Sequence, residues 1–297
     1  DSELVATTQR LLQVKPNKRA LLASGALREV RFFFQNTEDI FGNIGFFIID
    51  PDHVSIGSMR DANLGTRNLI AGQHPELFQQ AFEGQVGFVP PMTSDVALGP
   101  SSLSDKARKP PTMFFIGPVR DTDGRILAVM TLRVDPAKDF SQLLPPSITY
   151  KTRETYAFNE QGEMLSESRF EEELRRIGLI GRDQESALNV AIRDPGVNLL
   201  AGTVPEIERS QQPLTRMASS AIQLKADMAH AGKTKGRSKI EINTKGYRDY
   251  RGVPVFGAWL WNADLELGLA AEIDVTEAMA DYYQIRRTVF GVLGVTL

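Results

Sequence analysis

Two arginines are the side chains best placed for binding chemistry in this sequence. A strand predicted over residues 126–134 alternates between two faces, and Arg133 ends the face that begins with Leu127, Val129 and Thr131. There the guanidinium either clamps an anion or reaches solvent at the end of the strand. Arg60 directly follows an earlier predicted strand, where it either binds a carboxylate bidentately or pairs with its neighbour Asp61.

Four further residues complete a candidate binding site. Met92 and Phe114 would supply apolar walls, and Thr112 and Asp95 would supply polar contacts. Each of the four taken singly also fits ordinary packing or turn chemistry, so the prediction depends on the set. The predicted ligand-binding residues are therefore Arg60, Met92, Asp95, Thr112, Phe114 and Arg133.

Residues for catalysis and for metal binding are scarce. The chain has no cysteine, which excludes disulfides, thiolate zinc sites and cysteine nucleophiles. Its histidines, His53, His74 and His230, lie far apart without the spacing of a metal-binding pair. The glutamates at 171–173 follow one another on a predicted helix, where successive side chains point in different directions. With no nucleophile elbow and no phosphate-binding loop, we predict no catalytic residue, no metal site and no cofactor.

Length and charge narrow the class of protein further. The 297 residues, 42% of them hydrophobic, are enough for one large domain or two domains of about 150 residues. Lys and Arg number 34 against 37 Asp and Glu, a net charge of −3. That balance does not suit a polyanion, so nucleic acid is excluded as a partner.

The N-terminal region predicts a long amphipathic helix. It begins behind Pro16 with Asn17 as its cap and extends to about Phe41. Apolar residues recur in steps of three, four and seven, at Leu27, Val30, Phe34 and Phe41. This stripe either packs on its own domain or pairs with another copy of the chain, and we predict a homodimer through it in the intact protein.

The rest of the chain predicts β-hairpins, because apolar segments flank short polar turns. The paired segments are 46–50 with 54–59, 112–119 with 126–134, 156–158 with 163–166, and 247–250 with 253–261, followed by a strand at 267–273. Long insertions separate the hairpins within each half, and they contain predicted helices at 75–82, 171–177 and 214–228. The fold class is therefore α+β: a long N-terminal helix and two tandem modules, each an antiparallel sheet flanked by helices.

The predicted domain boundaries follow from these two similar modules. They are an N-terminal helical stalk (1–45), a first module (46–134), a linker (135–150), a second module (151–280) and a C-terminal helix (281–297). The chain begins at Asp1 without an initiator methionine, and residues 288–297 are uncharged and apolar behind Arg286 and Arg287. We expect either a truncated transmembrane segment or a buried C-terminal helix, and we prefer the first.

This arrangement resembles the double Cache (tandem PAS-like, PDC) sensor regions of bacterial transmembrane receptors. The stretches that carry the resemblance are Ser58-Met-Arg-Asp61 with Gly65 and Asn68, Glu154-Thr-Tyr-Ala-Phe-Asn159 with Leu165-Ser-Glu-Ser-Arg-Phe170, and Gly252-Val-Pro-Val-Phe-Gly-Ala-Trp259 leading to Glu272-Ile-Asp274. The resemblance implies a non-enzymatic periplasmic or extracellular region of an inner-membrane protein, tethered by flanking transmembrane helices outside this sequence. It also implies that a small molecule binds in the membrane-distal first module, under its insertion, and that a cytoplasmic kinase, cyclase or chemotaxis output receives the signal.

The chemistry expected of that ligand follows from a departure from the family pattern. Amino-acid-binding Cache regions resemble one another in an R-x-W-Y pattern and an acidic residue on a late strand, whereas this sequence has Phe88-Val-Pro-Pro-Met-Thr-Ser-Asp95 and basic Arg133. A carboxylate-bearing or neutral ligand is therefore expected. The alternatives are a module that senses a periplasmic protein partner and an extracytoplasmic hydrolase. In the second module, Tyr156, Ser166, Arg169 and Tyr250 fit a structural polar network as well as a small cavity, and we predict no site there.

Overall fold

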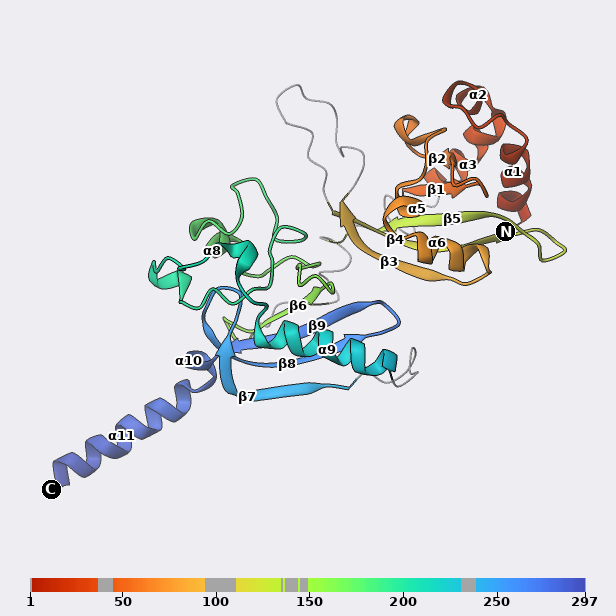
Figure 1. Cartoon of the computed structure of the whole chain (residues 1–297). Helices are drawn as coiled ribbons and strands as arrows, with labels where there is room; N and C mark the ends of the chain where they lie inside the picture. The colour runs from red at the N-terminus through yellow and green to blue at the C-terminus, as the bar shows by residue number, and fades with distance from the viewer. Residues whose placement is uncertain are drawn as a thin grey trace. The chain divides into compact units, whose positions relative to one another are not determined.

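The computed structural model describes residues 2–36, 45–93, 111–134, 136, 144, 149–230 and 239–296, with side chains through residue 290. The chain divides into two compact units, a first unit of Asp1–Pro136 and a second unit of Ala137–Leu297 (Figure 1). Each unit has one antiparallel sheet with helices, which confirms the predicted α+β fold with two tandem modules. Most of the predicted linker, 135–150, lies outside the described residues, and the finer boundaries stay predictions.

The sheet of the first unit has the strand order β2-β1-β5-β4-β3. Its strands are β1 (Phe46–Ile49), β2 (Ser55–Ser58), β3 (Gly87–Thr93), β4 (Pro111–Arg120) and β5 (Ile126–Val134). The pairing of β1 with β2 and of β4 with β5 confirms the first two predicted hairpins. We did not predict β3, which contains Pro90 and Pro91. It is an edge strand, where the missing N–H groups of proline are tolerated.

The two faces of the first sheet are covered by different parts of the chain. On one face, Phe46, Ile48 and Ala128 form a core with the helices α1 (Ser2–Leu12), α2 (Lys18–Ala23) and α3 (Gly25–Asn36). On the other face, side chains such as Phe47 and Val129 pack with α5 (Leu69–Gln73) and α6 (Pro75–Phe82) from the insertion. The predicted helix at 75–82 is therefore confirmed, and the second face is the one turned toward the insertion.

We predicted one continuous helix from Asn17 to Phe41, and this is wrong because the structure has two helices there, α2 and α3. Asn17 does cap α2, its side chain accepting a hydrogen bond from the Ala20 N–H at 3.0 Å. At Ser24, however, the backbone is extended, and the Ser24 hydroxyl accepts from the Ala26 N–H at 3.2 Å. Ser24 thus ends α2 and caps the start of α3, a role that serine prefers over a place inside a helix. Residues 37–41 lie outside the described part.

The apolar stripe of this region packs on its own unit. Leu27, Val30 and Phe34 are at most 6% exposed, and the ring of Phe34 stacks on that of Phe46 with the centroids 4.2 Å apart. These side chains are therefore not available for a seam with a second copy, which corrects the surface that we predicted for the dimer. The homodimer itself stays a prediction.

The second unit has the strand order β6-β9-β8-β7. Its elements are β6 (Glu154–Phe158), α8 (Glu171–Arg176), η3 (Leu199–Ala201), η4 (Arg209–Gln211), α9 (Arg216–His230), β7 (Glu241–Arg248), β8 (Pro254–Asn262) and β9 (Leu267–Asp274). The predicted strand at 163–166 is wrong: it forms only isolated bridges, from Met164 to Phe158 and from Glu163 to Ala191. Its backbone groups are divided between β6 and the insertion, so no continuous ladder forms.

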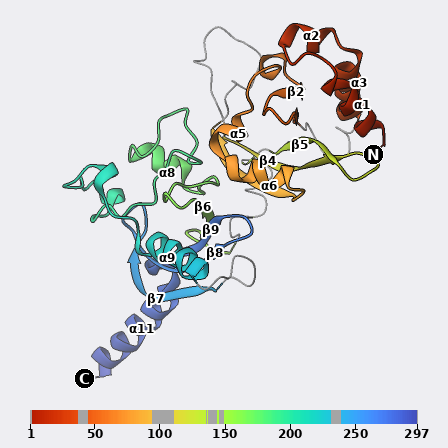
Figure 2. The same cartoon turned by 45° about the vertical axis from the view of Figure 1, so that its right-hand side comes forward.

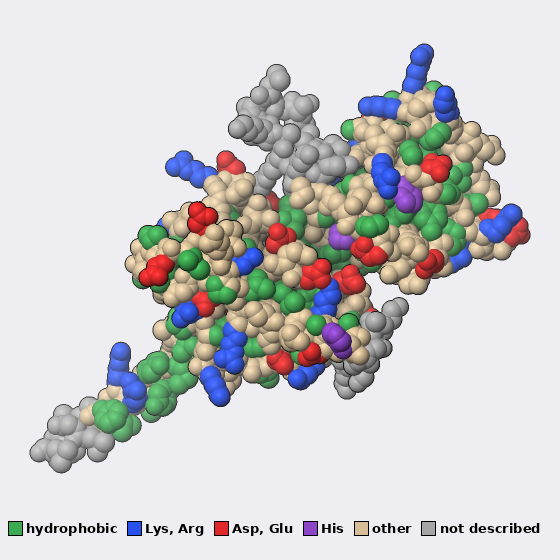
Figure 3. Space-filling view, in the orientation of Figure 1, with side chains coloured by type: hydrophobic (Ala, Val, Ile, Leu, Met, Phe, Trp, Pro, Cys, Tyr) green, Lys and Arg blue, Asp and Glu red, His purple; other side chains and the backbone are tan. Residues whose placement is uncertain are grey.

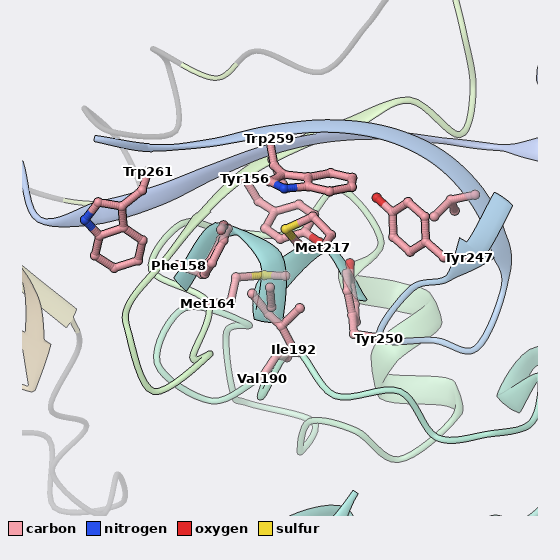
Figure 4. Close-up of a cluster of buried hydrophobic side chains, with 14 of the residues drawn as sticks. Tyr156, Phe158, Met164, Val190, Ile192, Met217, Tyr247, Tyr250, Trp259 and Trp261 are labelled. Atoms are coloured by element: carbon pink, nitrogen blue, oxygen red, sulfur yellow. The ribbon is translucent and has the colours of Figure 1, made fainter. Parts of the chain in front are cut away.

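Helix α9 lies against the sheet of the second unit in both views (Figures 1 and 2). Between them lies a core that extends from Trp261 to Tyr247 and Tyr250 (Figure 4). Trp259 and Trp261, at 4% and 1% exposed, share one face of β8, which confirms their predicted place in the core. Such large aromatic side chains supply much of the apolar area that a unit of this size buries.

The chain ends in two helices, α10 (Val275–Ala278) and α11 (Ala280–Thr296). Helix α11 carries exposed apolar side chains, Tyr282, Ile285, Val289 and Phe290 (Figure 3). In the part of the chain that the structure describes, no helix combines the length and the apolar character needed to cross a membrane.

Candidate functional site

Strands β4 and β5 bring three of the predicted site residues together. Phe114 lies directly opposite Arg133, and Thr112 follows on the same face, one step of the alternation away. The Nε–H of Arg133 donates a hydrogen bond to the Thr112 hydroxyl at 2.7 Å. Because Nε lies in the plane of the guanidinium, this bond helps to fix the orientation of the group.

Buried apolar side chains lie next to this pair. Met92 on β3 lies opposite Thr112, and it belongs to the same buried cluster as Phe114. Thr112 and Phe114 are each 1% exposed and Met92 is 4% exposed. Both apolar residues also pack with their neighbours as core residues do. Asp95, the remaining polar candidate, lies outside the described residues.

Arg60 lies across the sheet from Arg133. Ser58, the last residue of β2, pairs with Phe47, and Phe47 pairs with Thr131 of β5. Arg60 follows the end of β2 by two residues, and one strand, β1, lies between β2 and β5. Asp61 is bound by Arg31 of α3, whose Nη2 donates to its carboxylate at 2.7 Å.

The absence of a side chain at Gly45 leaves space for the side chain of Arg133. A Cβ added at this glycine would lie 3.2 Å from both Cβ and Cδ of Arg133, so any larger residue would press on the arginine stem. The Gly45 carbonyl also accepts the Arg133 backbone N–H. The aliphatic part of Arg133 therefore lies across the backbone beside β1.

Thr131 lies on the same face of β5 as Arg133, and the sequence analysis did not single it out. It is 0% exposed, and its hydroxyl has no hydrogen-bond partner among the residues that the structure describes. It lies opposite Phe47 on one side and Ile116 on the other. The only sequence signal was the alternation that placed a threonine between Val129 and Arg133 on one face.

The second unit holds a larger group of buried polar side chains. Glu154 and Glu272 face each other directly across β6 and β9, and they are 3% and 4% exposed. The hydroxyls of Tyr156 and Tyr247 donate to Glu272 at 2.7 and 2.5 Å. Burial, together with the negative charge of Asp249, raises the pKa of Glu272 to about 8 against the effect of these hydrogen bonds.

Glu154 is satisfied in the same manner. The hydroxyls of Ser168 and Tyr250 donate to its carboxylate at 2.5 and 2.8 Å, and the Arg169 backbone N–H donates at 3.0 Å. Burial raises its pKa, and the hydrogen bond from Ser168 and the charge of Arg251 oppose that rise. Two buried carboxyl groups on paired positions of neighbouring strands do not ionise together readily.

Arg251 is the buried cation of the second unit. Its guanidinium contacts Asp249 at 2.8 Å and Asp274 at 2.9 Å, and it stacks on the ring of Phe170 at 3.6 Å. Burial alone would lower its pKa, but the negative charge of Asp249 and the other neighbours raises the pKa above the ordinary value. These contacts join the turn after β7 to β9 and to the residue before α8.

These polar side chains of the second unit form a network of hydrogen bonds with one another and with the backbone. Tyr156 and Tyr250 bind glutamates, Ser166 accepts the Ala157 N–H, and Arg169 binds the carbonyls of Tyr150 and Arg153. Among the described residues, no group of histidines and carboxylates is arranged to hold a metal ion.

No protein-family model matches the sequence, and no curated protein is similar to it in sequence. Among solved structures, it is similar to the sensor domain of the V. cholerae histidine kinase DctB, with 13% identity and a TM-score of 0.49 over 92% of this chain and 84% of that one. It is also similar to the ligand-binding domain of the Campylobacter jejuni chemoreceptor Tlp3 in complex with L-valine, with 11% identity and a TM-score of 0.43 over 92% of this chain and 83% of that one. A third similar structure is the periplasmic domain of RsbU from Chlamydia trachomatis, with 12% identity and a TM-score of 0.46 over 95% of this chain and 93% of that one.

Proposed function

We propose that the chain is the extracytoplasmic sensor part of a membrane signal-transduction receptor, of the histidine kinase, cyclase or chemoreceptor type. In this proposal the first unit binds a small molecule that bears a carboxylate. The supporting observation is that Thr112 holds Arg133 on a sheet face whose neighbouring side chains are apolar and buried. A few polar groups that converge in apolar surroundings are typical of small-molecule sites.

The charge and geometry of Arg133 favour a carboxylate as the recognised group. A guanidinium matches a carboxylate with two parallel hydrogen bonds, and the bond from Nε to Thr112 fixes the plane of this one. In this proposal Arg60, which follows the end of β2, is a second cation for the same anion. An ammonium group, as in an amino acid, would be repelled by both.

Replacing either arginine should abolish ligand binding while leaving the fold intact. We expect Arg133→Ala and Arg60→Ala to lose about 2–5 kcal/mol of binding free energy, at least a tenfold loss of affinity, because a partly desolvated ion pair is removed. The measurement is the thermal shift that a panel of small carboxylates produces in the whole chain, followed by calorimetry. Without ligand, both variants should melt within a few degrees of the wild type.

The matched control is Arg169→Ala in the second unit. Arg169 donates to backbone carbonyls within that unit, so its loss should leave carboxylate binding unchanged. The proposed site would be refuted by a co-crystal structure that places the carboxylate elsewhere, or in which carboxylates of the protein itself occupy both arginines.

A further inference from the structure

The buried hydroxyl of Thr131 is an unusual feature of the first sheet. Within the described part of the chain its Oγ1 atom has no hydrogen-bond partner, and the residue is 0% exposed. A hydroxyl that loses water without gaining a partner destabilises the folded protein, so buried hydroxyls are normally bonded. A valine, which has the same shape, would occupy this position without that penalty.

The surroundings of Thr131 place its hydroxyl beside the proposed carboxylate site. Within β5 the side chains alternate, so Thr131 points to the same face as Val129 and Arg133. Its partners across the sheet, Phe47 and Ile116, are apolar, and neither side chain is able to accept a hydrogen bond. The Thr112 hydroxyl lies two steps of the alternation further along β4, beyond Phe114, where it accepts the hydrogen bond from Arg133.

We infer that Thr131 is a second ligand contact, and that it selects acids that carry a hydrogen-bonding group some distance from the carboxylate. This inference depends on the proposed function, because Arg133 is taken to hold the carboxylate. Residues two apart on a strand are separated by about 6.6 Å, and the Arg133 guanidinium extends toward Thr112, away from Thr131, so the two protein contacts lie at least that far apart. The ligand class is then a short acid with a second polar group, such as a hydroxyl or a carbonyl, at its other end.

Such a ligand explains why a destabilising threonine occupies this position. The acid satisfies the Thr131 hydroxyl only when it is bound, so the residue lowers the stability of the free protein and adds to the selectivity of the complex. A site built to bond a polar group rejects an analogue that lacks the group, because the protein atom is then left buried and unpaired.

The test compares matched acids in the wild type and in Thr131→Val. The pairs are 4-hydroxybutyrate with butyrate and 5-hydroxypentanoate with pentanoate, titrated calorimetrically into the whole chain. We expect the wild type to bind at least one hydroxy acid tenfold or more tightly than its partner, and Thr131→Val to bind the two alike. Free Thr131→Val should melt at the same temperature as the wild type or higher, and Thr131→Ser should keep the preference.

A second variant separates this inference from the proposed function. Thr112→Val removes the partner of Arg133, and it should weaken both members of a pair equally while keeping their ratio. If acids bind but the wild type does not distinguish the members of a pair, or if Thr131→Val keeps the preference, Thr131 is not a ligand contact. If no acid of the panel binds the wild type, the carboxylate site fails, and the inference fails with it.

Discussion

Arg251→Met is expected to destabilise the second unit by about 3–5 kcal/mol, the largest stability loss that we predict. The substitution leaves the carboxyl groups of Asp249 and Asp274 buried without their cation, and it removes the guanidinium from the face of the Phe170 ring. Methionine keeps much of the side-chain volume, so the loss reflects the uncompensated charges more than a cavity. Chemical denaturation followed by fluorescence measures it.

Fluorescence is specific for the second unit in this protein. Both tryptophans of the chain, Trp259 and Trp261, lie on β8, and all six tyrosines lie between residues 150 and 283. The unfolding of the first unit is therefore silent in tryptophan emission, and a change in the midpoint reports the second unit alone. A calorimetric scan adds the transition of the first unit.

The control for Arg251 is its near neighbour Arg248. Arg248 forms an ion pair with Asp194 at 2.8 Å, but its side chain is 46% exposed. Because solvent screens such pairs, Arg248→Met should cost under about 1 kcal/mol. Asp249→Asn in the Arg251→Met background should restore part of the stability, since it removes one unpaired charge. If Arg251→Met and Arg248→Met lower the free energy of unfolding equally, the buried network does not stabilise this turn more than the exposed ion pair does.

Local patterns in the sequence were sufficient for the hairpins β1–β2, β4–β5 and β7–β8, but not for the one predicted with 163–166. Strand alternation placed Phe114 and Arg133 correctly, because neighbours across an antiparallel pair follow from the register of a short hairpin. The edge strand β3 was missed since Pro90 and Pro91 contradict the usual strand composition, and only its position at the edge makes them acceptable. The break at Ser24 was missed because the apolar stripe continues through it.

The network around Arg251 could not be predicted from local patterns. Arg251 precedes Gly252, and the pair reads as a polar surface turn. In the structure this turn is covered by the insertion: the Leu199 N–H donates to the Arg251 carbonyl, and a Cβ on Gly252 would lie 1.8 Å from the Val197 carbonyl oxygen. The contacts that bury it come from residues that are 23 to 81 positions away, Asp274 and Phe170 among them. No periodicity connects such distant residues.

The facing glutamates make the stability of the second unit depend on pH. The pKa of Glu272 is about 8 in the folded protein, whereas the ordinary value, taken for the unfolded chain, is 4.5. Below pH 4.5 the carboxyl is protonated in both states, and its contribution to stability is fully present. Between pH 4.5 and 8 the unfolded chain releases the proton while the folded unit retains it, so stability falls as pH rises.

Glu272→Gln should remove this dependence. An amide has nearly the same shape and does not titrate; because the two tyrosine hydroxyls bind different carboxyl oxygens, its oxygen accepts from one of them and its NH2 donates to the other. One proton contributes about 1.4 kcal/mol per pH unit, so the difference should reach on the order of 3–5 kcal/mol by pH 8. We therefore expect wild type and variant to have similar stability near pH 4.5, and the variant to be the more stable at pH 8. Denaturation curves read by tryptophan fluorescence across this range measure the difference in slope. Parallel curves for the two proteins would mean that Glu272 is ionised in the folded unit, in which case the two tyrosine hydroxyls stabilise a buried anion instead of a neutral acid.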